Sequence, residues 1–335
     1  MSNKLVLLTG SNGFVGAHVC RELLTNGYRV RAVVRSQAKA DQVAKDHQQW
    51  SQQFDGFAVI PDITQPGVYD KAVQGVDYVM HVASPFTFDI QDNEKDLLIP
   101  AREGTKNILQ AASKQSSIKR VVITSSCAAL FDLSKGIRPG YTYTEQDWNP
   151  ATWDQASKSD NPRFVYCASK KIAEQAAWQF IKENNVSFDI TTMCMPMIYG
   201  PILHSINSLN ELNESNSQIW KIINGENKHF PPTGVPAFVD VRDTAVGHVR
   251  ALTTPEASNT RYVLSAGSFR FEQAAAIAQK RHPQIDILQG DTSPLDSYTI
   301  DGSKAKKDLL HRDYITFDQC ISDTADQLFE LAKKQ

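Results

Sequence analysis

The chain has 335 residues, of which 41% are hydrophobic and 21% charged, as in an ordinary globular protein. A formal net charge of −2, with Lys and Arg scattered, excludes a basic nucleic-acid-binding surface, and no segment approaches the roughly 20 apolar residues of a membrane span. The five cysteines are odd in number and far apart, so neither a zinc site nor a disulfide framework is indicated. We expect a cytoplasmic protein without metal, nucleic-acid or membrane partners.

The first part of the chain alternates short apolar runs with helical patterns. A buried strand is expected at residues 5–9, an amphipathic helix at 14–26 and a second strand at 28–34. Further strands are expected at 57–60, 77–83 and 119–125. Alternating strands and helices with this spacing predict an α/β fold, a Rossmann-type doubly wound parallel sheet.

The second part of the chain is less regular. A loop rich in Gly, Pro, Asp and Asn covers about 132–162, followed by a helix at 163–184 and a strand at 188–195. We divide the chain into a first domain, 1–195 with contributions from about 237–266, and a smaller substrate lobe, 196–335. The lobe is expected to include 205–228 and 269–288 and to cover the open edge of the sheet.

A glycine-rich turn joins the first strand to the first helix. In TGSNGFVG, residues 9–16, Gly10 allows a sharp turn, Gly13 lets the backbone approach a pyrophosphate, and Gly16 lets the helix pack closely. The free N–H groups at the helix N-terminus attract the anion. The alternative is a tight turn without a ligand. The predicted cofactor contacts here are Gly10, Ser11, Asn12, Gly13, Phe14, Val15 and Gly16.

The end of the second strand indicates which dinucleotide binds. NAD enzymes usually carry Asp or Glu there for the ribose hydroxyls, but this chain has Arg35, with Lys39 one turn later and Arg31 earlier. These cations suit the 2′-phosphate of NADP(H), although a solvated basic patch is the alternative. Asp62 and Ile63 follow the next strand and are predicted to hold the adenine, unless Asp62 is an ordinary turn residue.

A tyrosine and a lysine four residues apart form the predicted catalytic pair. Tyr166 and Lys170 lie on one face of the helix predicted at 163–184. A nearby cation can lower the pKa of a phenol, which is ordinarily about 10. Ser126 follows a strand at the sheet edge where open α/β sheets bind ligands, so its hydroxyl can bond a substrate oxygen. The alternatives are an exposed Tyr–Lys pair and a serine that caps its loop.

Together these residues resemble the extended short-chain dehydrogenase/reductase family. The nearer resemblance is to its dihydroflavonol-reductase-like branch, which includes yeast-type NADPH-dependent methylglyoxal and aldehyde/ketone reductases. It is carried by the glycine turn and by HVASPF (81–86), TSSCAA (124–129), NPATW (149–153), YCASKK (166–171) and FVDVRD (238–243). The resemblance implies further cofactor contacts at Ala83, Ser84, Pro196, Ile198 and Ser215. Met195 stands where the family commonly has Asn.

The function implied is an NADPH-dependent carbonyl reductase that transfers hydride to aldehydes or ketones. Methylglyoxal-like compounds, keto esters and aryl ketones are the expected substrates. The protein is expected to be a monomer or a homodimer. A sugar-nucleotide epimerase or dehydratase, or a non-catalytic nucleotide sensor, is the alternative. The candidates for an apolar substrate pocket are Phe86, Phe88, Cys127, Phe131 and Tyr199, and the alternative for each is ordinary core packing.

Overall fold

The computed structural model describes residues 3–84 and 90–334. Its centre is a seven-stranded sheet with the order β10-β7-β5-β4-β1-β2-β3, and every pairing in it is parallel. This order confirms the predicted Rossmann-type sheet. The strands are β1 (Leu5–Thr9), β2 (Arg29–Val34), β3 (Phe54–Val59), β4 (Tyr78–His81), β5 (Arg120–Ser126), β7 (Asp189–Met195) and β10 (Thr260–Val263).

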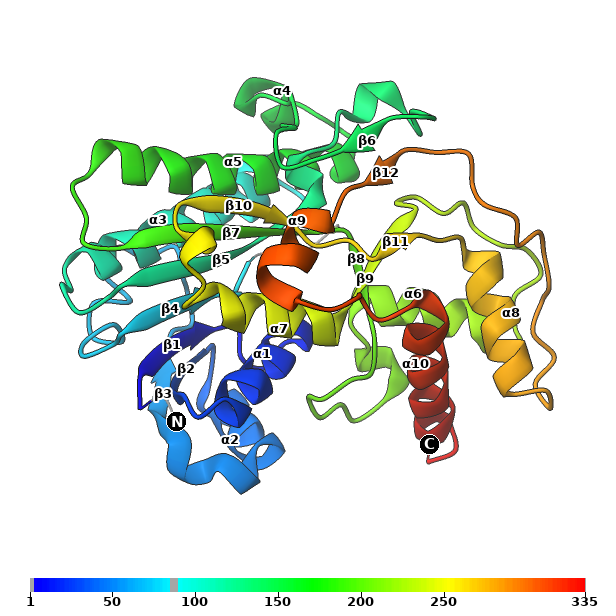
Figure 1. The fold of residues 1–335 in the computed structure, drawn as a ribbon, viewed down its shortest axis with the longest axis horizontal. Helices are drawn as coiled ribbons and strands as arrows, with labels where there is room; N and C mark the ends of the chain where they lie inside the picture. Colours follow the sequence, from blue (N-terminus) through cyan, green and yellow to red (C-terminus); the bar gives the residue numbers. More distant parts are fainter. Residues whose placement is uncertain (1–2, 85–89, 335) are drawn as a thin grey trace.

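Helices cover both faces of this sheet (Figure 1). The helices α1 (Phe14–Thr25) and α7 (Val241–Ala251) pack on one face, and α3 (Ile99–Ser113) and α5 (Pro162–Glu183) on the other. Each face has its own buried core, because strands covered on both sides carry apolar residues at nearly every position. The helix α2 (Gln37–Asp46) packs beside β2 and β3.

The strand β3 begins three residues earlier than the predicted 57–60. Asp55 and Gly56 suggest a turn in the sequence, but both lie inside the strand, where Gly56 has a φ of +123° beside a register shift. The Asp55 carboxylate accepts hydrogen bonds from Arg29 and Arg31 on the neighbouring strand. These cross-strand ion pairs explain why an Asp-Gly pair continues the sheet.

The predicted loop at 132–162 contains a short helix and a short strand. The helix α4 (Trp153–Ser157) starts at a capping box in which the Thr152 and Gln155 side chains each bond the other's backbone N–H. The strand β6 (Thr142–Tyr143) pairs with β12 (Thr299–Ile300) from near the C-terminus. Both elements are too short to show hydrophobic periodicity, although the capping box was a readable signal.

A smaller lobe lies beyond the carboxyl ends of the central strands rather than along an edge strand (Figure 1). Its sheet, β11-β9-β8, contains β8 (Met197–Tyr199), β9 (Ala237–Asp240) and β11 (Gly267–Ser268). Its helices are α6 (Glu214–Ile223), α8 (Phe271–Arg281) and α10 (Phe317–Ala332), which share one apolar core. The short helix α9 (Ser303–Ala305) lies beside β10.

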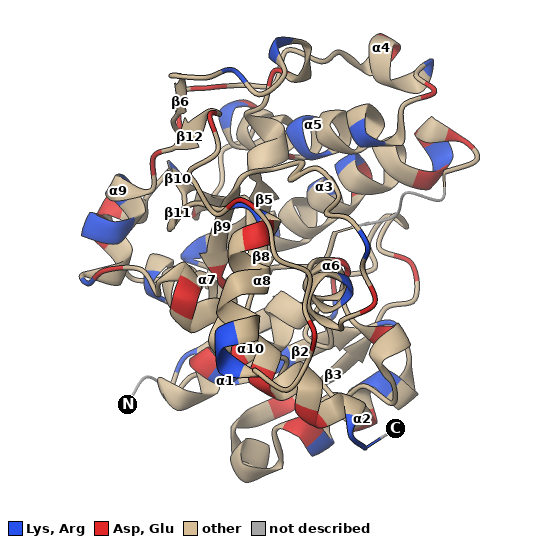
Figure 2. Ribbon diagram, turned by 90° about the vertical axis from the view of Figure 1, so that its right-hand side faces the viewer, with Lys and Arg blue, Asp and Glu red and all other residues tan. Residues whose placement is uncertain are grey.

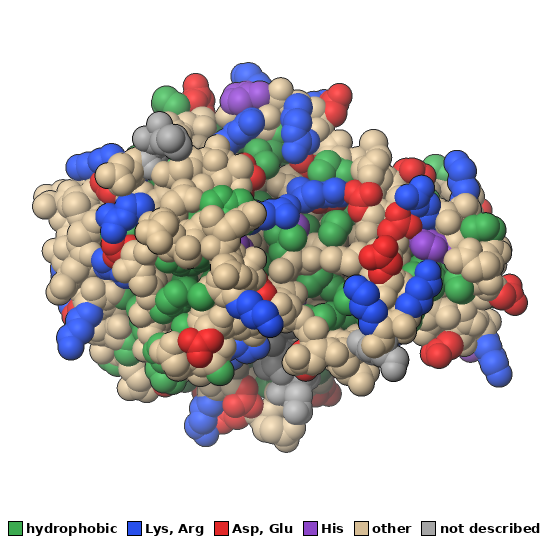
Figure 3. All heavy atoms as spheres, turned by 90° about the horizontal axis from the view of Figure 1, so that it is seen from below, with side chains coloured by type: hydrophobic (Ala, Val, Ile, Leu, Met, Phe, Trp, Pro, Cys, Tyr) green, Lys and Arg blue, Asp and Glu red, His purple; other side chains and the backbone are tan. Residues whose placement is uncertain are grey.

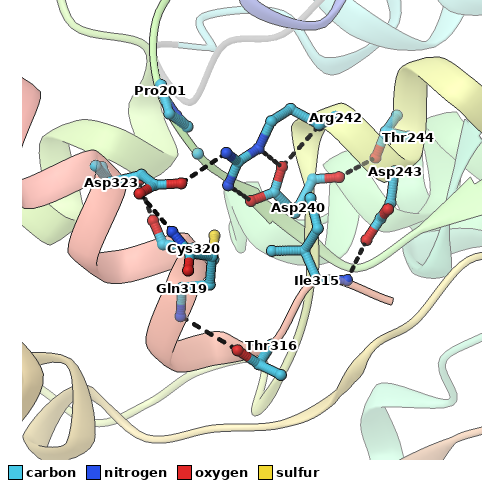
Figure 4. A network of polar contacts seen from close by, with 12 residues as sticks. Pro201, Asp240, Arg242, Asp243, Thr244, Ile315, Thr316, Gln319, Cys320 and Asp323 are labelled. Atoms are coloured by element: carbon cyan, nitrogen blue, oxygen red, sulfur yellow. Dashed lines mark hydrogen bonds and ion pairs between the residues drawn. The ribbon is translucent and has the colours of Figure 1, made fainter. Parts of the chain in front are cut away.

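An ion-pair network fastens the lobe to the central layer (Figure 4). Asp240, fully buried at the end of β9, caps α7 and accepts hydrogen bonds from Arg242 Nε (2.9 Å) and Nη2 (2.7 Å). Arg242 Nη1 donates to Asp323 on α10 at 2.6 Å. Asp243 accepts from the Ile315 N–H at 2.7 Å. The N-terminus of α7 therefore holds both α10 and the segment that precedes it.

The surface carries charges of both signs. Lys and Arg alternate with Asp and Glu over the helices in Figure 2, and Figure 3 shows the same mixture around hydrophobic side chains on the face seen from below. This distribution agrees with the net charge of −2. Among the helices of the described residues, none combines the length and apolar character needed to cross a membrane. All five cysteines are free and buried.

Candidate active site

A cavity of about 1260 Å³ lies where the central sheet meets the lobe. The glycine turn, the ends of β2, β4 and β5, and the first turns of α5 line one side of it. The opposite side is formed by β8, α6 and the segment 227–235. The carboxyl ends of parallel strands are where open α/β sheets bind ligands, and this cavity occupies that position.

The glycine turn forms the floor of one end of the cavity. Gly10 has a φ of +70°, and a Cβ atom at Gly16 would lie only 1.9 Å from the Gly10 carbonyl oxygen. A Cβ atom at Gly13 would meet nothing closer than 3.5 Å, yet Gly13 lines the cavity. Gly13 is also the N-cap of α1 and makes no side-chain cap. The turn therefore leaves helix N–H groups and open space where an anion can bind.

Two of the three cations noted in the sequence reach this end of the cavity. Arg35 and Lys39 both line it, and the Lys39 ammonium donates to Gln42 at 2.9 Å. Arg31 instead points away, where it bonds Asp55 and the carbonyls of Ala72 and Gln74. Exposed Arg35 and Lys39 are thus placed to receive a phosphate, whereas Arg31 is part of the sheet's own ion pairing.

Most of the other predicted cofactor contacts also line the cavity. They are Asn12, Phe14, Val15, Ile63, Ala83, Ser84, Pro196, Ile198 and Ser215. Ser11 and Asp62 are not among the lining residues. Ser11 is fully buried with its hydroxyl 3.4 Å from the Val33 carbonyl, and the Asp62 carboxylate caps its own turn at Thr64 and Gln65. The roles of Ser11 and Asp62 stay predictions.

The serine and tyrosine of the predicted catalytic set meet at the centre of the cavity. Ser126 and Tyr166 both line it. Burial raises the pKa of Tyr166, and the nearby Ser126 hydroxyl partly opposes this rise. The Ser126 hydroxyl also caps the 3₁₀ turn Cys127–Ala129 by accepting from the Ala128 N–H at 3.1 Å. Ser126 thus lines the cavity and also makes the capping contact that the sequence suggested, and its catalytic role stays a prediction.

The lysine lies directly behind this pair. Lys170 is buried, its Nζ atom is 5.3 Å from the centre of the Tyr166 ring, and it donates to Ser84 Oγ at 2.5 Å. Burial lowers the pKa of Lys170 to about 8. Nearby His81 is buried too, and its pKa falls to about 4 through burial and the charge of Lys170. His81 is therefore neutral at physiological pH.

The other end of the cavity is largely apolar. Cys127, Phe131 and Tyr199, predicted for the substrate pocket, line the cavity, and each also packs in a core cluster, so their role stays a prediction. Phe86 and Phe88 lie outside the described residues. The sequence analysis missed several lining residues, namely Tyr69, Arg163, Phe230, Val235, Phe269 and Phe271. The position of Arg163 near the cavity could have been predicted from the sequence, because Arg163 precedes Tyr166 by three residues and so shares its helix face.

Comparison with known proteins decides the family. Residues 6–267 match the NAD dependent epimerase/dehydratase family, which is most of the chain. The chain belongs to this family. An oxidoreductase of Schizosaccharomyces pombe is 40% identical over 100% of this chain and 99% of its own length. The NADPH-dependent methylglyoxal reductase of Saccharomyces cerevisiae is 34% identical over 97% of this chain and 98% of its own length.

A solved structure of this family extends the comparison to the fold. The yeast methylglyoxal/isovaleraldehyde reductase complexed with NADPH superposes with a TM-score of 0.91 at 33% identity, covering 99% of this chain and 100% of that one. The predicted membership of the extended short-chain dehydrogenase/reductase family is thus confirmed, and so is the predicted fold class.

Proposed function

We propose that this protein is an NADPH-dependent carbonyl reductase that converts aldehydes or ketones to alcohols. The observation that carries the proposal is that Ser126 and Tyr166 line the same cavity, with Lys170 one helical turn from Tyr166 and bonded to Ser84, which also lines it. The names of the relatives support the same activity. The small-molecule substrate would enter the apolar end of the cavity.

The residues around the cavity fit NADPH at its other end. The α1 N-terminus has no side-chain cap, and a Cβ atom at Gly13 would have only the Gly10 carbonyl oxygen, at 3.5 Å, within 4 Å, so a pyrophosphate has room to approach it. Arg35 and Lys39 stand where the 2′-phosphate would meet them. NADPH would supply the hydride to the carbonyl carbon.

The chain's own residues would handle the proton and the oxygen. Ser126 donates a hydrogen bond to the carbonyl oxygen as negative charge develops there. Tyr166 has a raised pKa, so it holds its proton at neutral pH and gives it to the same oxygen. Lys170, as an ammonium, holds the nicotinamide ribose and stabilises the tyrosinate that remains. The tyrosine is reprotonated from solvent before the next turnover.

The lining residues favour an uncharged carbonyl substrate over a sugar nucleotide. The cavity lining includes Cys127, Phe131, Phe230, Val235 and Phe271, which we expect to contact the substrate. A nucleotide diphosphate would need several convergent donors in the same space, and the Arg163 guanidinium already donates to the Gly234 carbonyl at 2.7 Å. Methylglyoxal-like compounds, keto esters and aryl ketones are the substrates we propose. A sensor is disfavoured because Ser126, Tyr166 and Lys170 are all present and brought together.

The decisive experiment follows NADPH oxidation with a panel of ketones and aldehydes. Tyr166→Phe keeps the ring and removes the acid, so turnover should fall about 10²–10⁴-fold while NADPH still binds. Tyr262→Phe is the matched control. Tyr262 lies on β10, outside the cavity lining, and its hydroxyl bonds Asp308 at 3.1 Å. Near-normal reduction by folded Tyr166→Phe protein would refute the proposed function, and turnover of nucleotide sugars alone would favour the epimerase alternative.

Location and assembly belong to the same proposal. A reducing compartment such as the cytoplasm is supported by the five free cysteines. A monomer or a homodimer is expected, and light scattering of the purified protein distinguishes the two. Cell fractionation tests the cytoplasmic location.

A further inference from the structure

A buried carboxylate joins the catalytic helix to three strands of the sheet. The Glu174 side chain on α5 is 1% exposed. It accepts hydrogen bonds from Ser125 Oγ on β5 and Thr192 Oγ1 on β7, both at 2.7 Å. Arg261 on β10 donates to it through Nε at 2.8 Å and Nη2 at 3.2 Å. A charge this deeply buried needs such partners, so the four side chains form one rigid unit.

Two members of this unit, Ser125 and Glu174, lie on the same elements as the proposed catalytic residues. Ser125 immediately precedes Ser126 on β5. Tyr166, Lys170 and Glu174 follow one another at intervals of four residues, so they lie on one face of α5. A shift of α5 along β5 would therefore change the distance between the Ser126 and Tyr166 hydroxyls. The bonds from Glu174 to the sheet oppose that shift.

The arginine extends the same unit to the turn after Ser126. Arg261 Nη1 donates to the carbonyls of Glu145 at 3.0 Å and Asp147 at 2.5 Å. Two residues later, Asn149 donates from its side chain to the Ala128 carbonyl at 3.0 Å and from its backbone to the Ala129 carbonyl at 2.8 Å. The segment held by Arg261 thus supports the turn that begins at Ser126.

We propose that Glu174 and Arg261 form a positioning pair that sets the distance between the Ser126 and Tyr166 hydroxyls. The proposal rests on the proposed function, since it concerns the geometry of that proton transfer. Glu174 acts through Ser125 and through α5, and neither Glu174 nor Arg261 lines the cavity. A misplacement of about 1 Å in a catalytic group can cost about a hundredfold in rate.

A second ion pair of the same design provides a matched control. Arg120 on β5 bonds both carboxylate oxygens of Asp189 on β7, and its Nη1 donates to the carbonyls of Ala251 at 2.7 Å and Thr254 at 2.6 Å. The Arg120 side chain is 9% exposed and the Asp189 side chain is 21% exposed. This pair joins the amino ends of β5 and β7, whereas the Glu174 pair joins the part of the strands that leads to the cavity.

The experiment compares Glu174→Gln with Asp189→Asn for kcat, KM, NADPH affinity and thermal unfolding. Both substitutions remove one negative charge beside an arginine, fully buried for Glu174 and 21% exposed for Asp189, so both should lower the melting temperature. Glu174→Gln alone should lower kcat, by about tenfold or more, because only it disturbs catalytic geometry. KM and the dissociation constant of NADPH should change less than about threefold.

Ser125→Ala serves as a milder variant should Glu174→Gln fail to fold. It removes one bond to Glu174 and keeps the ion pair, and kcat should again fall more than in Asp189→Asn. Equal kcat losses in the Glu174 or Ser125 variant and in the Asp189 variant would overturn the positioning role. That result is distinct from failure of the proposed function, which Tyr166→Phe reports independently.

Discussion

Lys170 Nζ and Ser84 Oγ lie 2.5 Å apart, joining the middle of α5 to the segment after β4 across 86 positions of the chain. The contact holds the ammonium in a buried place, and burial lowers the pKa of Lys170 to about 8. Burial disfavours the charged form of an amine, which is the direction seen here. The residue that we propose acts as an ammonium is therefore close to its point of deprotonation at neutral pH.

The pH dependence of reduction should reflect this lysine. Below pH 8 the ammonium is intact, and above it the charge is lost, so kcat/KM should fall as the pH rises through about 8. Lys170→Arg stays charged and should abolish that decline, at a lower overall rate. Lys171→Ala is the control, because its ammonium bonds the Ala151 carbonyl instead. A wild-type profile flat to pH 10 would contradict the assignment.

Cofactor choice should depend on Arg35. A charge-assisted hydrogen bond contributes about 1.5–3 kcal/mol, so Arg35→Ala should weaken NADPH roughly ten- to a hundredfold and leave NADH nearly unchanged. Fluorescence titration of both cofactors measures the difference. Arg29→Ala removes a cation of β2 that pairs with Asp55 instead, and it should alter neither affinity. Equal losses for both cofactors on Arg35→Ala would show that Arg35 does not contact the phosphate.

The two later glycines of the turn should respond differently to alanine. Gly16→Ala places a Cβ atom 1.9 Å from the Gly10 carbonyl oxygen, so the backbone must move and the protein should be destabilised. Gly13→Ala meets no atom within 3.4 Å and should fold normally, but its methyl group would lie where we propose that the pyrophosphate binds. We expect Gly13→Ala to keep its melting temperature without NADPH and lose the increase that NADPH produces. Unfolding curves with and without NADPH provide the test.

Tyr69→Phe should stabilise the protein in the absence of NADPH. Tyr69 is fully buried, and its hydroxyl has no hydrogen-bond partner among the described residues. A buried polar group without a partner costs about 1–3 kcal/mol, so removing the hydroxyl should raise the free energy of unfolding by about 1 kcal/mol. Denaturant titration measures the change, with Tyr262→Phe as a control that loses a formed hydrogen bond. A loss of stability in Tyr69→Phe would mean that the hydroxyl is satisfied by water.

The parts of the site that the sequence analysis located are those encoded by neighbouring residues. The glycine turn occupies eight consecutive positions, 9–16, and Tyr166 and Lys170 are one helical turn apart. Arg35 follows directly from the end of β2. In each case local backbone geometry alone places the groups together, so spacing is sufficient evidence.

The parts that were missed depend on contacts between distant segments. Glu174 meets Arg261 across 87 positions, and nothing in the spacing of either residue indicates that pairing. Phe230 reaches the cavity from an irregular segment with no periodicity. Asp55 lies within β3 only because arginines on β2 neutralise it. Such placements follow from the assembled fold, which a single sequence does not display.

The cavity wall formed by residues 227–235 lies in a different part of the sequence from the residues proposed to bind NADPH and to transfer the proton. It comes after α6, carries none of the residues that we assign to NADPH or to proton transfer, and meets the catalytic helix through the bond from Arg163 to Gly234. Insertions or exchanges in this stretch can therefore redirect substrate choice and the stereochemistry of the alcohol while the reduction chemistry is inherited intact. For a biocatalyst, it is the segment to randomise first in directed evolution.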